Sequence, residues 1–156
     1  MDTKTPYEQL TDLEKVQTQW HNLSGLHTRE EWSAAIVRAA TAAEIAATFA
    51  VRREFELNSE FDSSFVDSLL RWANGLAGKL DRLLLPISVE NKAKNTELKS
   101  LKKIAEDINA KRNAIAHQGE FCNEGEAQAV IAQAEKFITT LVQIYEPKFV
   151  LKTRKR

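Results

Sequence analysis

The residues best suited to chemistry stand together in the stretch Arg112-Asn113-Ala114-Ile115-Ala116-His117. An imidazole titrates near neutral pH and serves as a general acid or base, while a guanidinium binds phosphate oxygens through two parallel hydrogen bonds. Asn113 and His117 are four residues apart, so they share a face of a helix. Arg112 and His117 are five apart, about 140° beyond a full turn, and one straight helix does not aim both at one point. A long arginine side chain, a helix ending near Gly119 or a second copy of the chain could close this gap.

Arg112 also interrupts an apolar stripe on the same expected helix. The stripe consists of Leu98, Leu101, Ala105 and Ile108, which are spaced alternately three and four residues apart. The same spacing continues to positions 112 and 115, which are Arg112 and Ile115. A guanidinium on an inward face is costly to desolvate unless it is paired. We therefore expect a carboxylate, a partner subunit or a phosphate ligand to compensate Arg112. The alternative role for His117 is structural, because a histidine in the last turn of a helix complements the helix dipole.

Glu44 is the natural candidate for that carboxylate. It is the only charged residue between Arg38 and Arg52, in a stretch of small and apolar residues. It also falls on the same helical stripe as Val37, Ala40, Ala47 and Val51. We predict a buried ion pair between Glu44 and Arg112, which is either a structural link between two helices or part of a site.

Helix start and stop signals divide the chain into five expected helices. These run from about 6 to 23, from about 29 to 57, from the cap Asp62-Ser63-Ser64 to Pro86, from about 96 to 117, and onward from the cap Asn123. Capping boxes are expected at Thr5–Glu8 and Thr28–Glu31, and Gly25 is expected to stop the first helix. Gly75 and Gly78 fall inside the third helix, where we interpret them as points of close packing.

The expected fold is all-α, a single domain built as an up-and-down bundle of about five helices. Residues 1–28 form an N-terminal helix and connection, 29–146 the helical bundle, and 147–156 a basic, frayed tail. No uninterrupted apolar run approaches about 18 residues, so we expect no membrane-spanning helix. Cys122 is the only cysteine, which excludes an intramolecular disulfide and favours a reducing compartment. The N-terminus has no apolar secretory core, so we expect a cytoplasmic protein.

Charge is balanced overall but unevenly distributed. The 22 lysines and arginines equal the 22 acidic residues, so net charge gives no reason to expect a nucleic-acid or membrane partner. Residues 71–112 nevertheless carry ten basic and five acidic side chains, and 147–156 carry five basic ones and no acidic one. These segments could form a local positive surface for RNA phosphates. Trp20, Trp32 and Trp72 are spread over three helices, and we interpret them as core or interface anchors rather than an RNA-stacking cluster.

The spacing Arg112-Asn113-x-x-x-His117 resembles the Arg-Asn-(x)3-His signature of the HEPN superfamily (higher eukaryotes and prokaryotes nucleotide-binding domains). The placement is similar too, at the end of the penultimate long helix and before Gly119 and an amphipathic last helix. Glu44 resembles the polar residue that the family's long second helix contributes. The resemblance covers roughly residues 29–146. It implies a two-fold homodimer in which two motifs face each other, and metal-independent endoribonuclease activity without a cofactor.

By this resemblance, each site residue has an expected role. His117 would be the general acid or base, Arg112 would stabilise charge on the phosphate, and Asn113 would orient the phosphate or hold His117. Glu44 would position Arg112. The products would be a 2′,3′-cyclic phosphate and a 5′-hydroxyl. The resemblance further implies a toxin or phage-defence effector that acts on RNA, with an antitoxin or regulatory protein as a candidate partner and neither membrane nor DNA as a ligand.

The sequence differs from the family's toxin branch at one position, and two other functions are alternatives to the ribonuclease. The family's toxin branch carries a tyrosine, the target of adenylylation, two residues after the histidine, where this chain has Gly119, so that mode of neutralisation is in doubt. A non-catalytic HEPN-like dimer that regulates or binds another protein is the main alternative, supported by the neutral total charge and the acidic first 70 residues. A metalloenzyme or nucleotide-dependent transferase has little support, because the sequence has three dispersed histidines, one cysteine, no HExxH motif and no phosphate loop.

Overall fold

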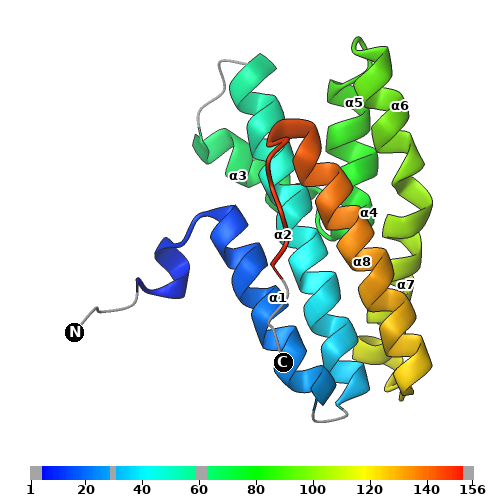
Figure 1. The fold of residues 1–156 in the computed structure, drawn as a ribbon. Coiled ribbons are helices and arrows are strands. Elements are labelled where there is room, and N and C mark those ends of the chain that lie inside the picture. The colour runs from blue at the N-terminus through cyan, green and yellow to red at the C-terminus, as the bar shows by residue number, and fades with distance from the viewer. Residues whose placement is uncertain (1–4, 29–30, 59–62, 153–156) are drawn as a thin grey trace.

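The computed structural model describes residues 5–28, 31–58 and 63–152, and every regular element in these ranges is helical. The expected all-α class is therefore confirmed. Figure 1 shows the arrangement of the elements, which are the 3-10 turn η1 (Tyr7–Gln9), α1 (Asp12–Thr28), α2 (Trp32–Asn58), α3 (Ser63–Trp72), α4 (Leu76–Lys79), the π-helical turn η2 (Leu80–Leu84), α5 (Leu85–Ile87), α6 (Lys92–Ser100), α7 (Lys102–Gln118) and α8 (Glu124–Tyr145).

The long helix α2 lies at the centre of the fold. Helices α1 and α8 make its most extensive contacts, and α4 and α7 also pack against it (Figure 1). Its middle is rich in fully buried alanines, among them Ala39, Ala42, Ala43, Ala46 and Ala50. Small side chains let the neighbouring helices approach α2 closely, which explains why this stretch of the sequence is alanine-rich.

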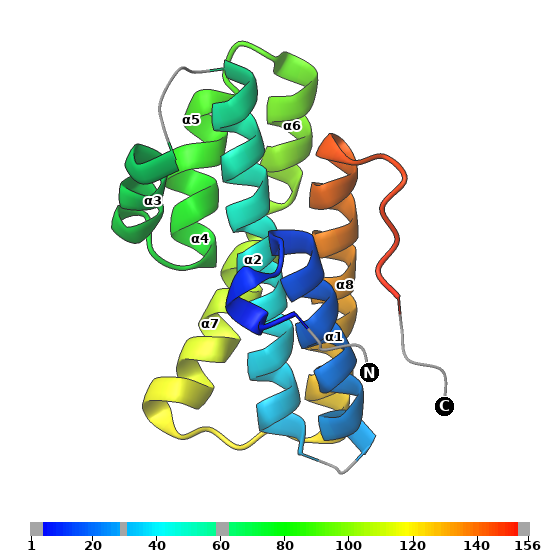
Figure 2. The ribbon, with the colours of Figure 1, turned by 90° about the vertical axis from the view of Figure 1, so that its left-hand side faces the viewer.

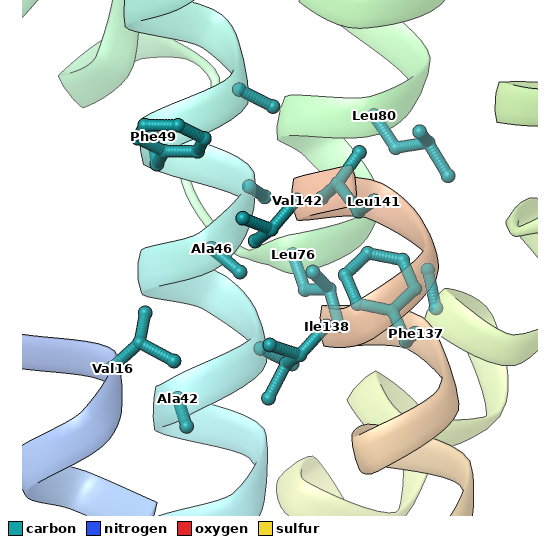
Figure 3. Packing of buried hydrophobic residues seen from close by; sticks show 14 of the residues in the cluster. Val16, Ala42, Ala46, Phe49, Leu76, Leu80, Phe137, Ile138, Leu141 and Val142 are labelled. Atoms are coloured by element: carbon teal, nitrogen blue, oxygen red, sulfur yellow. The ribbon is translucent and has the colours of Figure 1, made fainter. Parts of the chain in front are cut away.

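The main core fills the space between α2 and its neighbours. Figure 3 shows residues that belong to this core, which are Val16 of α1, Ala42, Ala46 and Phe49 of α2, Leu76 of α4, Leu80 of η2, and Phe137, Ile138, Leu141 and Val142 of α8. Phe137, Ile138 and Leu141 are fully buried. The burial of these large apolar side chains supplies the main driving force for packing α8 against α2.

The first α-helix begins later than the sequence predicts. Residues Tyr7–Gln9 form only a 3-10 turn, and α1 starts at Asp12. Thr11 is the true cap: its N–H donates to Glu14 Oε1 at 3.0 Å, and the Glu14 N–H donates to Thr11 Oγ1 at 3.2 Å. This is a complete capping box, which outcompetes the similar pattern upstream at Thr5–Glu8. Gly25 does not stop the helix, which continues to Thr28 because a single glycine costs only about 1 kcal/mol in a helix.

Two other expected caps cannot be compared directly. The patterns at Thr28–Glu31 and Asp62-Ser63-Ser64 include residues outside the described ranges. The helices that they were expected to open begin at Trp32 and at Ser63, close to the predicted starts.

The third expected helix is broken by Gly75. Helix α3 ends at Trp72, Gly75 adopts φ +83° and ψ 166°, and α4 begins at Leu76. This backbone region is open essentially to glycine alone, so the chain changes direction here. A Cβ placed on Gly75 would lie 3.8 Å from Asn109 Oδ1, and one on Gly78 would lie 3.5 Å from its nearest neighbour. Both are ordinary contacts, so the interpretation of these glycines as close packing points is wrong.

Pro86 lies in the last turn of its helix, which ends at Ile87, one residue past the predicted stop, and the hydrogen bonding changes there. The Leu85 N–H donates to the Leu80 carbonyl, five residues back, and the helix continues through Pro86 to Ile87. Proline lacks an N–H and crowds the carbonyl four residues earlier, and a π-helical turn accommodates this. Carbonyls near the proline are satisfied by side chains, because Ser88 Oγ donates to the Leu84 carbonyl at 2.7 Å and Asn95 Nδ2 to the Leu85 carbonyl at 3.0 Å.

The fourth expected helix is divided in two at Leu101. Helix α6 begins at Lys92, earlier than predicted, because Asn91 Oδ1 accepts a hydrogen bond from the Lys94 N–H. The predicted apolar stripe is confirmed, since it is buried along its length at Leu98, Leu101, Ala105 and Ile108. Gly119 terminates α7 with φ +65°, and Asn123 caps α8 by accepting from the Glu126 N–H, both as predicted.

The described part of the C-terminal tail is not frayed. Leu151 is buried in the main core. Lys152 and Gln17 of α1 form a reciprocal pair, in which the Gln17 amide donates to the Lys152 carbonyl at 2.7 Å and the Lys152 N–H donates back to Gln17 at 2.9 Å. The tail therefore runs back along the molecule and is attached to α1 (Figure 1).

Helix α2 is more apolar than the sequence analysis expected. Over residues 32–57 it is long and apolar enough to cross a membrane by length and composition alone, with a mean hydropathy of 1.5 in its most apolar window. A few polar residues interrupt the apolar stretch of α2, so it contains no uninterrupted apolar run although its mean hydropathy is high. In the structure 61% of that window is buried inside the protein.

Candidate functional site

The motif lies in the last two turns of α7, where Arg112 and Asn113 contact each other. Both side chains are half-buried, and Arg112 Nη1 donates to Asn113 Oδ1 at 3.4 Å. This bond uses one of the two lone pairs of the Asn113 amide oxygen and leaves its two N–H groups as donors. The pair offers guanidinium and amide N–H donors, which suit an anionic ligand.

His117 stands apart from that pair. Its imidazole is exposed in the last turn of α7, ahead of the terminator Gly119. Among the described residues it makes no hydrogen bond or ion pair. Its spacing places it on the same face as Asn113, one turn further along the helix. The structure thus joins Arg112 with Asn113 and leaves His117 open at the helix end.

Glu44 does not pair with Arg112, which corrects the prediction from the sequence. Its carboxylate is 35% exposed and accepts a hydrogen bond from Lys79 Nζ at 3.1 Å. The Lys79 side chain is only 7% exposed. Lys79 comes from α4, which begins directly after the break at Gly75 and packs against α2.

Arg112 and Ile115 both continue the apolar stripe of α7 in sequence, but only Ile115 packs against other apolar residues. Ile115 packs against a second apolar cluster formed by Ile36, Ala127 and Val130, with Trp32 beside it. This cluster joins the end of α7 to α2 and α8. Arg112, one position earlier on the stripe, remains half-exposed. The end of α7 is therefore anchored through Ile115, and the arginine is not drawn into the core.

A charged network next to the motif was missed by the sequence analysis. Lys111 Nζ donates to Glu120 Oε1 at 2.9 Å and also to Glu126 Oε2. The hydrogen bond from Lys111 holds the pKa of the Glu126 carboxyl below its usual range, and the two carboxylates raise the pKa of Lys111. The network ties the connection after Gly119 to both α7 and α8. The sequence signal was present, since Lys111 precedes the motif and two glutamates follow it, but nine and fifteen residues separate them.

The same connection and the first turn of α8 contain the only grouping of three metal-ligand types found in the described ranges. One ligand atom each from Glu120, Cys122 and Glu126 lies within 4.8 Å of the others. The Lys111 ammonium already supplies positive charge to both carboxylates. A cation would have to compete with this lysine, so the arrangement functions as an ion-pair network.

A buried polar triad lies away from the motif. Glu54 is 1% exposed and accepts from Lys94 Nζ at 2.6 Å and from the Tyr145 hydroxyl at 3.0 Å. Burial and the adjacent Glu54 carboxylate raise the pKa of Tyr145. The triad links α2, α6 and α8, and sequence reasoning missed it because its members lie on three separate helices.

Comparison with known proteins adds no family to these observations. No protein-family model, curated protein or solved structure matches this chain. The features of the chain that bear on function are the geometry of Arg112, Asn113 and His117 and the motif that they form.

Proposed function

We propose that this protein is a metal-independent endoribonuclease that cleaves RNA by means of the substrate's own 2′-hydroxyl. The observation that carries the proposal is the Arg112–Asn113 pair, which offers several N–H donors at the surface one turn before an exposed histidine. This combines an anion-binding group with a titratable group, and together they match the needs of phosphodiester transesterification.

The chemistry requires no group beyond those of the chain and the substrate. A general base takes the proton of the 2′-hydroxyl, whose oxygen forms a bond to phosphorus while the bond from phosphorus to the 5′-oxygen breaks. A general acid gives a proton to the leaving oxygen, so the products are a 2′,3′-cyclic phosphate and a 5′-hydroxyl. His117 is proposed for proton transfer, and Arg112 and Asn113 for stabilising the additional negative charge on the phosphate oxygens.

A two-fold dimer is part of the proposal, together with an up-and-down arrangement of the helices. Arg112 and His117 project from α7 in different directions, so one protomer does not converge them on one phosphate. A second copy related by a two-fold axis could supply the histidine to the arginine of its partner, and two-fold dimers are the commonest oligomers. Sedimentation over a wide concentration range should give twice the chain mass of 17.6 kDa. A monomer at high micromolar concentration would rule out the composite site.

The activity test is cleavage of single-stranded RNA by purified protein in the presence of EDTA. RNA should be cut and DNA left intact, because DNA lacks the attacking 2′-hydroxyl. His117→Ala should abolish cleavage without unfolding the protein, since the exposed imidazole contributes little packing. His21→Ala is the matched control, because His21 is an exposed histidine on α1. Equal rates for the wild type and His117→Ala would reject the proposal and indicate a contaminating nuclease.

Two further variants separate charge from geometry. Arg112→Lys keeps the positive charge but loses the planar fork that binds two phosphate oxygens, so it should lower the rate more than the stability. Asn113→Ala removes the acceptor of the Arg112 hydrogen bond and should have an intermediate effect. Glu44→Gln should leave the cleavage rate of the folded protein within a few-fold of wild type, because Glu44 contacts Lys79 of the same chain and not Arg112.

One observation favours the alternative, a non-catalytic dimer that acts as a regulatory or protein-interaction module. The acidic residue expected to position Arg112 is engaged elsewhere, so the arginine is held only by Asn113 within the described residues. If no RNA from a broad set is cleaved but the dimer forms, this alternative is the better description. As an active enzyme, the protein is proposed to act in the cytoplasm as a toxin or defence effector restrained by an antitoxin or regulatory protein.

A further inference from the structure

An exposed tryptophan on α3 has no role in the site described so far. Trp72 is 60% exposed, whereas Trp20 is 3% exposed and Trp32 is half-buried. The fold therefore does not need the Trp72 indole in its core. A single exposed apolar side chain is common on protein surfaces, so a binding role for Trp72 depends on the groups around its ring.

The ring of Trp72 is positioned by an arginine. The Arg82 guanidinium carbon lies 5.3 Å from the indole centroid, a cation–π arrangement. Arg82 follows the Gly75 break by seven residues, so the turn in the chain brings η2 back toward the end of α3. The result is an oriented aromatic ring beside a positive charge, which is the combination that binds nucleotides of single-stranded nucleic acid.

Among the described residues, the three arginines of residues 71–112 lie outside the ion pairs of that segment, and so do Lys92 and Lys99. Between residues 71 and 112 five lysines form ion pairs with carboxylates, namely Lys79, Lys94, Lys102, Lys103 and Lys111. Among the described residues, the three arginines of this segment contact no carboxylate: Arg71 bonds to Ser68, Arg82 lies over Trp72 and Arg112 bonds to Asn113. Their charge remains available to phosphates.

Trp72 is followed in the chain by a corner and a helix, α4, that pack against the motif-bearing helix α7. The corner that follows Trp72 contacts α7, because a Cβ on Gly75 would be 3.8 Å from Asn109 Oδ1. Asn109 is one helical turn before Arg112 and Asn113. Figure 2 shows α3 and α4 on the same side as the end of α7, whereas in Figure 1 α3 and α7 lie on opposite sides of α2. Helix α4 packs against α7, so a single strand bound at Arg112 could pass along α4 to Trp72.

We propose that Trp72, oriented by Arg82, stacks against a base of single-stranded RNA whose phosphate binds at Arg112. This inference rests on the proposed function, since it takes RNA as the ligand of the motif. Stacking on an indole accepts any base, so the platform would add affinity for single strands without sequence preference. A double-stranded RNA would bind less well, because its bases are already stacked on one another.

The test measures binding of two synthetic oligomers to the non-cleaving His117→Ala protein. One is a 12-nucleotide oligouridylate and the other an abasic ribose-phosphate oligomer with the same number of phosphates. Trp72→Leu should weaken binding of the oligouridylate about tenfold, the range expected for loss of one base–aromatic stack, and leave the abasic oligomer unchanged. Trp72→Phe should keep part of the affinity. Loss of binding to both oligomers in equal measure, or no loss at all, would overturn the platform.

Two controls address charge and partner. Arg82→Gln should weaken oligouridylate binding, whereas Lys136→Gln, which removes one exposed positive charge from α8, should not. Binding of oligouridylate should quench the wild-type tryptophan fluorescence, and Trp72→Phe should remove that quenching although Trp20 and Trp32 remain. A change in oligomeric state caused by Trp72→Leu would overturn the proposal and assign the ring to a protein contact instead.

The outcomes also separate this inference from the proposed function. If wild-type protein cleaves RNA and Trp72→Leu leaves KM unchanged, the platform is rejected while the nuclease stands. If no RNA is cleaved but binding depends on Trp72 as described, the platform stands and the nuclease is rejected. Absence of binding by every form of the protein rejects the platform.

Discussion

The Lys79 ammonium lies 3.1 Å from the Glu44 carboxylate, and the two groups differ greatly in their contact with water. The lysine side chain is 7% exposed and the glutamate side chain 35% exposed. Desolvation therefore falls mainly on Lys79, which depends on Glu44 more than Glu44 depends on it. The pair links α4 to α2 immediately after the Gly75 break.

This asymmetry predicts unequal effects of the two single substitutions. Glu44→Gln leaves a nearly buried ammonium uncompensated and should lower the free energy of unfolding by about 3 kcal/mol. Lys79→Met leaves a glutamate that water can reach and should change it by less than about 1 kcal/mol. Urea unfolding followed by circular dichroism measures both. Asp107→Asn, which breaks the exposed pair with Lys103, is the control and should have little effect. Equal losses in the free energy of unfolding for Glu44→Gln and Lys79→Met would contradict the asymmetry.

The buried triad should tolerate loss of its lysine less well than loss of its hydroxyl. Lys94→Met removes the cation next to the fully buried Glu54 carboxylate and should cost roughly 3–5 kcal/mol. Tyr145→Phe removes one hydrogen bond to a charged acceptor and should cost about 1.5–3 kcal/mol. Thermal and denaturant unfolding give the order. If Tyr145→Phe lowers the free energy of unfolding more than Lys94→Met does, the Lys94–Glu54 ion pair contributes less than the Tyr145–Glu54 hydrogen bond.

The two glycines at the α3–α4 corner should respond to alanine in opposite directions. Gly75 has φ +83° and ψ 166°, a conformation that costs an L-residue about 1–3 kcal/mol, so Gly75→Ala should destabilise by that amount. Gly78 is helical, and an added Cβ would make only ordinary contacts, so Gly78→Ala should stabilise by about 0.5–1 kcal/mol. Destabilisation by Gly78→Ala, with Gly75→Ala neutral, would show that the corner is not set by the Gly75 backbone.

The Lys111 network predicts a pH dependence of the connection between α7 and α8. Because the pKa of Glu126 is lowered in the folded protein, its contribution is complete above the ordinary glutamate pKa and is lost as the pH falls toward the lowered value. The amide of Cys122, which donates to Ser33 Oγ at 3.1 Å, reports on this connection. Its hydrogen exchange, corrected for the intrinsic rate, should accelerate below about pH 4.

A substitution separates this effect from general acid unfolding. Lys111→Met should accelerate exchange of the Cys122 amide already at pH 7 and remove most of the pH dependence. Lys103→Met, which disrupts an exposed pair on the same helix, is the control and should leave the Cys122 amide unchanged. Unaltered exchange in Lys111→Met would show that the connection is held by other contacts.

The sequence alone determined the helical class and the features that depend on neighbouring residues. The stripe Leu98–Ile108, the terminator Gly119 and the cap Asn123 were predicted from spacing and residue type, and the structure has them as expected. Such features are set within one or two helical turns, so the local sequence contains the information that decides them. Where two similar local signals competed, as at Thr5–Glu8 and Thr11–Glu14, the sequence did not indicate which would cap the helix.

Only the tertiary structure decided which charged groups meet. From the sequence Glu44 was the evident partner of Arg112, yet Glu44 pairs with Lys79 and Arg112 with Asn113. The direction of the chain after Gly75 selects that lysine, and it follows from one backbone conformation that glycine permits but does not require. The exposure of Trp72 likewise depends on where the other helices pack. Ion pairs and surfaces between distant segments are set by this packing, because it fixes distance and desolvation, which together decide the partner of a charge.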